Sequence, residues 1–280
     1  MDTLRIYNIP SEYSFADALA EGLWRRADRD PPTLGQGIVL VPHRRAGRVL
    51  AEAFLRLGQG RAMLLPEIRA VGDVDEDEPF GDTAFALEAE TGDDCPPAIS
   101  ELRRQLLLTR LVMRYLSSTS GRASRPDASP DQAARLAMEL ARLLDQMQTE
   151  GISFKALAGL VPDEHARHWR QTLDFLLIAR EFWPRLLEEE GAVDPAVRRD
   201  RMLGDLCDRW TRNPPGRQIT IAGSTGTVPA TARLMAVVAR LPAGALVLPG
   251  LDMALDDASW RAAGSDSAHP QHALSLLLKR

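Results

Sequence analysis

The sequence has few cysteines, almost no lysine and no long apolar run. Cys95 and Cys207 are too few and too widely separated for a disulfide framework or a metal cluster, so we expect a reducing, cytoplasmic environment. No apolar run approaches the roughly 18 residues that span a bilayer, and no signal-peptide pattern opens the chain. We therefore expect a soluble protein that does not bind membranes.

Lysine is confined to Lys155 and Lys279, and every other basic residue is arginine. The formal net charge is −5, so the surface as a whole does not attract nucleic acid, and any such site has to be local. With 280 residues, the chain can form one large domain or two ordinary ones.

Short apolar runs alternate with helical patterns near the N-terminus. We predict strands at Leu4–Pro10, Gly37–Pro42 and Ala62–Val74, separated by helices at Ser14–Ala27 and Arg45–Gly58. The first strand is expected to be buried, and the second to be covered on both faces. Ser14 and Asp17 resemble a capping box. The second helix carries an apolar stripe of Val49, Leu50, Phe54 and Leu57. This alternation predicts a parallel sheet with crossover helices.

Helical patterns dominate the middle of the chain. The expected helices are Glu101–Leu116, Asp131–Gln148, His168–Gly191 with a kink at Pro184, and Val197–Gly216. The first carries Leu102, Leu106, Val112 and Tyr115 near a helical period, and the second places Leu136, Leu140, Leu143, Leu144 and Met147 on one face, the apolar pattern of a packed helix. The alternating pattern then resumes with strands at Gln218–Gly223 and Gly244–Gly250 around a helix at Pro229–Leu241. We divide the chain into an α/β part (1–99), an inserted helical subdomain (100–215) and a continuation of the α/β part (216–280).

An acidic stretch runs from Ala70 to Leu102 and contains 11 acidic residues but no lysine or arginine. Its Gly, Pro and Asp content favours a solvated loop that repels phosphate. The alternative is an acidic arm that binds a partner protein or mimics DNA.

Two positions lack the residues of a working nucleotide site. A phosphate loop needs converging glycines and a lysine, but neither residue occurs between Tyr7 and Glu21. A magnesium-holding strand ends in a carboxylate, and the corresponding strand here ends in Ala222-Gly223. The following residues Ser224, Thr225, Gly226 and Thr227 favour a tight turn before a helix with Pro229 in its first turn. The alternative interpretation is that these residues make a weak contact with an anion or a nucleic-acid backbone.

A basic turn follows the second strand. Pro42, His43, Arg44 and Arg45 precede a helix, whose N-terminal amides and arginines could hold a nucleic-acid phosphate. The alternative is a solvated first helical turn. The helix dipole disfavours arginine there unless an anion is nearby.

No other cluster predicts catalysis or metal binding. His165 and His168 lie three positions apart but have no third ligand nearby, so surface histidines are the favoured interpretation. Asp252, Asp256 and Asp257 follow a strand and are expected to cap the next turn. We expect no catalytic residues and no metal ligands.

Five blocks of the sequence resemble the AddB family, the second subunit of bacterial AddAB helicase–nucleases, in its alphaproteobacterial form. The blocks, in order, are Tyr7–Leu23, Val39–Leu55, Leu64–Glu78, Ile221–Asp252 and His269–Leu278. Two motifs within them are specific, "LPEIRAVGDVDEDE" and "AGSTGTVPATA". The helical middle adds little to the resemblance.

The resemblance implies a RecA-like, superfamily 1 helicase-like sheet, of the P-loop NTPase type, interrupted by a helical subdomain. It implies an AddA-type partner subunit that carries the motor. Residues Pro42, His43, Arg44 and Arg45 match the helicase motif that touches single-stranded DNA. The family's nuclease domain and iron–sulfur cluster would lie beyond Arg280, so we expect no cofactor in this segment. Its last helical pattern ends without a stop signal, which suggests a fragment of a longer protein.

The chain departs from the family at both nucleotide motifs, which indicates that this segment has no ATPase activity. We expect a helicase-like scaffold that guides single- or double-stranded DNA and contacts the partner subunit in double-strand-break repair by homologous recombination. Two alternatives stay open: an ATPase with an atypical phosphate site around Gly223–Thr227, and a pure protein-interaction module that uses the acidic stretch.

Overall fold

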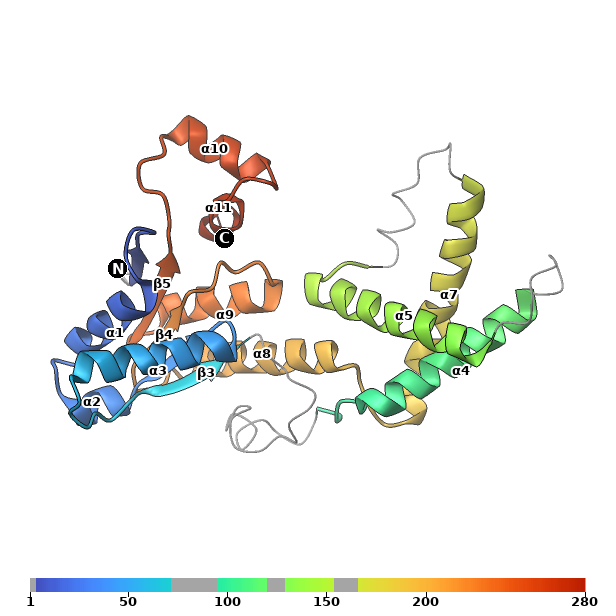
Figure 1. Ribbon diagram of the computed structural model, residues 1–280, viewed down its shortest axis with the longest axis horizontal. Coiled ribbons are helices and arrows are strands. Elements are labelled where there is room, and N and C mark those ends of the chain that lie inside the picture. The colour runs from blue at the N-terminus through green and yellow to red at the C-terminus, as the bar shows by residue number, and fades with distance from the viewer. Residues whose placement is uncertain (1–3, 72–94, 120–128, 154–165, 280) are drawn as a thin grey trace. The chain divides into compact units, whose positions relative to one another are not determined.

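The computed structural model describes residues 4–71, 95–119, 129–153 and 166–279 (Figure 1). Within them lies a five-stranded sheet of order β1-β5-β4-β2-β3 in which every pairing is parallel. The strands are β1 (Ile6–Ile9), β2 (Ile38–Val41), β3 (Glu67–Ala70), β4 (Ile219–Ala222) and β5 (Gly244–Pro249). The predicted parallel α/β class is confirmed, and the sheet is consistent with a RecA-like fold.

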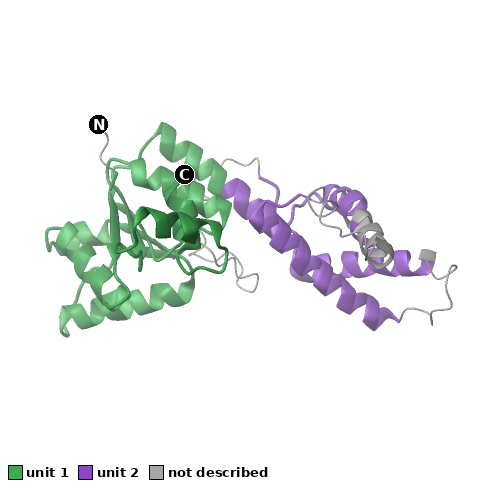
Figure 2. Cartoon of the chain, turned by 90° about the horizontal axis from the view of Figure 1, so that it is seen from above, with its two compact units in different colours: residues 1–91, 203–280 green, residues 92–202 purple. Residues whose placement is uncertain are grey.

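The chain forms two compact units, which Figure 2 colours separately. One unit combines Met1–Thr91 with Leu203–Arg280, and the other is Gly92–Met202, whereas the sequence placed the boundaries at 99 and 215. The first unit contains the sheet with α1 (Phe15–Arg26), α2 (Pro31–Gly35), α3 (Arg44–Gly58), α9 (Pro229–Arg240), α10 (Asp257–Ser265) and α11 (His272–Leu278). The second contains α4 (Glu101–Thr119), α5 (Pro130–Glu150) and α7 (Ala166–Glu189). Helix α8 (Pro195–Arg212) starts in the second unit and ends in the first.

Helices cover both faces of the sheet. Alternate residues of β2 point to opposite faces: Val39 and Val41 join the core with α1, α2 and α3, while Ile38 and Leu40 join the core with α8 and α9. All four side chains of β2 are buried. The expectation of a strand covered on both faces is confirmed, because alternate side chains of β2 are buried in the two cores on opposite faces of the sheet.

Strand β1 was expected to be buried, and this prediction was wrong. Among the described strands it pairs only with β5 and so lies at one edge of the sheet, where Leu4, Ile6 and Tyr7 are 39–50% exposed. An apolar run shows that a segment can form a strand, but it does not indicate where that strand lies in the sheet.

Several predicted apolar stripes do not coincide with the buried faces of their helices. Val49 of α3 is exposed, and Ala53 takes its place beside Leu50 and Phe54. In α4, Leu102 and Leu106 are exposed, while the buried side chains are Arg104, Leu107, Leu108, Leu111 and Val112. Leu136 of α5 is exposed, although Leu140, Leu144 and Met147 are buried as predicted. Leucine occurs on more than one side of these helices, so its spacing alone does not select the packed face.

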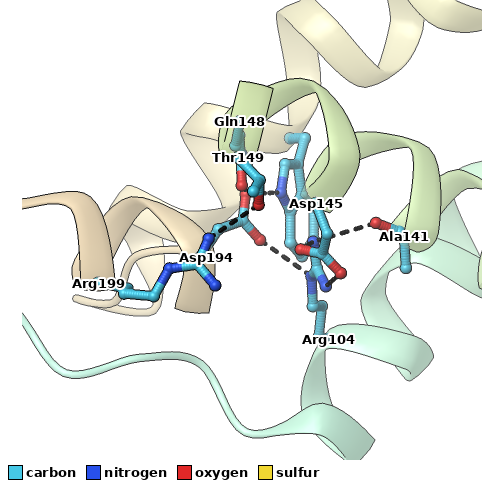
Figure 3. A network of polar contacts seen from close by, with 8 residues as sticks. Arg104, Ala141, Asp145, Gln148, Thr149, Asp194 and Arg199 are labelled. Atoms are coloured by element: carbon cyan, nitrogen blue, oxygen red, sulfur yellow. Dashed lines mark hydrogen bonds and ion pairs between the residues drawn. The ribbon is translucent and has the colours of Figure 1, made fainter. Parts of the chain in front are cut away.

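A buried charged network holds the helices of the second unit together (Figure 3). Asp194, at 1% exposure, lies 2.9 Å from Nε of Arg104 and accepts hydrogen bonds from the indole N–H of Trp183 and the amide of Gln148. Arg104 also donates to Asp145 at 2.8 Å. These residues come from α4, α5, α7 and the segment just before α8, so one carboxylate links four parts of the chain.

Both cysteines are free thiols, and burial raises the pKa of the Cys207 thiol. Among the helices of the described residues, none combines the length and the apolarity that crossing a bilayer requires.

Candidate functional site

The carboxyl ends of neighbouring strands β2 and β4 form the topological switch point of this sheet. The chain leaves β2 for α3 on one face and leaves β4 for α9 on the opposite face. Ligands of open parallel α/β sheets bind at such points, where successive connections diverge. Both predicted site segments lie at this edge: Pro42–Arg45 runs from the end of β2 into the first turn of α3, and Ser224–Thr227 lies in the turn between β4 and α9.

The β2–α3 turn presents a basic helix start. The imidazole Nδ1 of His43 accepts a hydrogen bond from the amide of Ala46 at 3.0 Å, so His43 caps α3. Arg45 and Arg48 are exposed, and Arg44 is half-buried. The first turn of α3 contains no acidic residue. The helix dipole disfavours each cation here by about 0.3–1 kcal/mol, so an anion at this position would relieve an unfavourable arrangement.

The β1–α1 turn has the opposite charge. Ser14 occupies the N-cap position as predicted, but its hydroxyl makes no capping hydrogen bond to the helix amides and instead donates to the Asp17 carboxylate at 2.6 Å. Asp17 also accepts from the guanidinium of Arg56 at 2.6 Å. The hydrogen bond from Ser14, and then the one from Arg56, lower the pKa of Asp17. An ionised carboxylate therefore lies in the first turn of α1, where a nucleotide phosphate would bind in a phosphate-loop protein.

The conformation and packing of the β4–α9 turn account for its two glycines. Gly223 and Gly226 both have positive φ values, 77° and 65°. The amide of Gly226 donates to the hydroxyl of Ser224 at 3.2 Å, and a Cβ on Gly226 would lie 2.7 Å from Leu277 of α11. Thr225 is half-buried and Thr227 is exposed. Pro229 occupies the first turn of α9, as the sequence predicted.

These three turns meet at Gly223. A Cβ at that position would lie 3.3 Å from the Phe15 ring and 3.7 Å from Cδ of Pro42. The first residue of α1 and the residue after β2 therefore pack against the end of β4. Sequence reasoning missed Phe15, and the available signal was an aromatic residue directly after a helix cap at a strand's carboxyl end.

The remaining predicted residues have structural roles or lie outside the described part. Asp256 caps α10 by accepting from the amide of Ser259 at 2.7 Å, and Asp252 accepts from the amide of Ala254. His165 and most of the acidic stretch lie outside the described residues, as does the side chain of His168. Among the described side chains, no group of three potential ligands could hold a metal ion.

No protein-family model and no curated protein sequence matches this chain.

Proposed function

We propose that this chain is a helicase-like domain of an AddB-type DNA-repair subunit, with a RecA-like sheet interrupted by a helical insertion. It acts without its own ATPase, guides DNA during double-strand-break repair, and contacts an AddA-type helicase subunit. The family assignment rests on the sequence resemblance alone, and so does the proposed partner subunit. The DNA contact has separate support from the geometry of the β2–α3 turn.

The observation that carries the DNA contact is the contrast between two helix starts at one sheet edge. The first turn of α3 has exposed Arg45, with Arg48 one turn on and no acid, whereas the first turn of α1 has Asp17. A backbone phosphate is attracted to the first and repelled by the second. With a net charge of −5, the chain has no general attraction for DNA, so a local contact of this kind is required.

Three features support the absence of ATP hydrolysis. The β1–α1 turn lacks the glycines and the lysine of a phosphate loop, and Asp17 lies where the phosphates would be. Strand β4 ends in Ala222, so it offers no carboxylate for magnesium. The Phe15 ring packs on Gly223 at the same edge.

The test compares single-stranded DNA binding by the wild-type chain and the Arg44→Ala/Arg45→Ala variant. Fluorescence anisotropy measures the binding over a range of salt concentrations. Loss of two phosphate contacts should lower the affinity and reduce the slope of log K against log salt by about 1.4, at about 0.7 per contact on a single strand.

The matched control is Arg135→Ala/Arg142→Ala on α5, which changes the net charge from −5 to −7 in the same way. Both control arginines are exposed and form local ion pairs with Asp131 and Glu139. An equal loss of binding in both variants would show a general charge effect and contradict the site. Micromolar binding of a fluorescent ATP analogue with magnesium would contradict the proposed absence of a nucleotide site.

A further inference from the structure

The β1–α1 turn lies beside the β2–α3 turn, although the two contacting residues, Phe15 and Pro42, are 27 positions apart in the sequence. The contact is made through Gly223, which both the Phe15 ring and Pro42 approach. Tyr13 precedes Phe15 by two residues, and Arg45 follows Pro42 by three. Chain segments of two and three residues reach at most about 7 and 11 Å, so Tyr13 and Arg45 each lie within that reach of a residue that packs against Gly223.

The β1–α1 turn is not suited to hold a phosphate. It has no basic residue, and it carries Glu12 and Asp17, of which Asp17 is already paired with Arg56. Its remaining large side chain is Tyr13, which is 62% exposed. The turn itself is ordered by a hydrogen bond from the amide of Tyr13 to the carbonyl of Pro10 at 3.2 Å.

We propose that Tyr13 is a stacking platform for a base of the single strand whose backbone binds at the β2–α3 turn. This inference rests on the proposed function and adds the group that contacts the bases. Proteins that bind single strands without sequence preference combine a basic groove for the backbone with aromatic side chains for the bases. Here the basic and aromatic parts come from two neighbouring turns, and the acidic residues near Tyr13 keep the phosphates on the arginine side.

The platform predicts a separation of two effects on binding. Tyr13→Ala removes a base contact but no phosphate contact, so the affinity for an oligothymidylate of about 16 nucleotides should fall at least about fivefold. The slope of log K against log salt should stay unchanged, in contrast to Arg44→Ala/Arg45→Ala. Tyr13→Phe keeps the ring and should bind like the wild-type chain.

The matched control is Tyr7→Ala. Tyr7 is 50% exposed and lies in the same unit, but it belongs to strand β1 and not to the turns around Gly223. This variant should bind oligothymidylate like the wild-type chain. A second probe, an abasic oligonucleotide of the same length, offers phosphates without bases. Wild-type and Tyr13→Ala chains should bind it equally.

The outcomes distinguish this inference from the function on which it rests. Unchanged oligothymidylate binding by Tyr13→Ala, together with loss in the arginine variant, overturns the stacking platform and leaves the phosphate contact. If Tyr13→Ala loses as much affinity for the abasic probe as for oligothymidylate, the stacking platform is also overturned, because the tyrosine would then contribute to binding without a base. If the wild-type chain binds neither probe, both proposals are wrong.

Discussion

Removing the carboxylate of Asp194 should destabilise the helical unit strongly. In the Asp194→Ala variant, buried Arg104 loses an ion-pair partner, and the buried indole N–H of Trp183 and the amide of half-buried Gln148 lose their hydrogen-bond acceptor (Figure 3). Arg104 is 4% exposed, so water cannot replace the lost partner without a rearrangement of the helices. Its remaining carboxylate, Asp145, is more exposed.

Burial sets the size of this effect. Breaking a buried ion pair by removing one partner costs about 3–5 kcal/mol where the remaining charge has no other partner, and we expect the lower end of this range because Arg104 keeps its contact with Asp145. The total stability of a domain is only about 5–15 kcal/mol, so this loss is a large fraction of the stability of the helical unit.

An exposed pair of similar geometry provides the control. Glu139 and Arg142 on α5 are 2.7 Å apart, close to the 2.9 Å between Asp194 and Arg104, but both side chains are about 70% exposed. Glu139→Ala should change the free energy of unfolding by no more than about 1 kcal/mol. The two variants therefore compare burial at nearly constant distance.

Hydrogen exchange of the full chain, read by mass spectrometry, is the suitable assay, because the chain has two compact units and need not unfold in one step. Asp194→Ala should lower the protection of α4 and α5 and leave β2, β4 and β5 protected. Adding Arg104→Met removes the buried charge that Asp194 paired with and should restore part of the loss, as double-mutant coupling requires. A loss below about 1 kcal/mol in Asp194→Ala, or no recovery in the double variant, would refute the assigned role of the network.

Two further predictions concern the sheet unit. Gly244→Ala should lower the free energy of unfolding by about 3 kcal/mol or more, because its Cβ would lie 1.8 Å from the carbonyl oxygen of Val238. Gly22→Ala, in the open interior of α1, should instead raise it by about 0.5–1 kcal/mol. Urea denaturation measures both changes, and a mild effect at Gly244 would contradict the packing. The lowered pKa of Asp17 means that its contribution to stability is present above about pH 4 and is lost as the pH falls through its folded-state value. Asp17→Asn should therefore lose less stability than the wild-type chain on acidification, and parallel losses in the two proteins would argue against the contacts with Ser14 and Arg56.

Much of the secondary structure could be predicted because its causes are local. The continuous apolar run at β2 predicted a strand covered on both faces, the runs at β4 and β5 predicted strands, and their alternation with helices predicted parallel pairing. The basic turn at Pro42–Arg45 was also visible, because it follows directly from a strand and a helix start. The capping box at Ser14 failed, because Asp17 takes the serine hydroxyl as a hydrogen-bond donor.

The sequence by itself determined the kinds of elements, the missing lysine and carboxylate at the nucleotide motifs, and the arginines of the β2–α3 turn. Only the tertiary structure decided that β1 is an edge strand, that α4 buries Leu107 and Leu108 rather than Leu102 and Leu106, and that Phe15 meets Pro42 at Gly223. The physical reason is the range of the interactions. Propensity and patterning act over one or two helical turns, whereas strand order, the packed face of a leucine-rich helix and the contacts of Asp194 depend on residues far away along the chain.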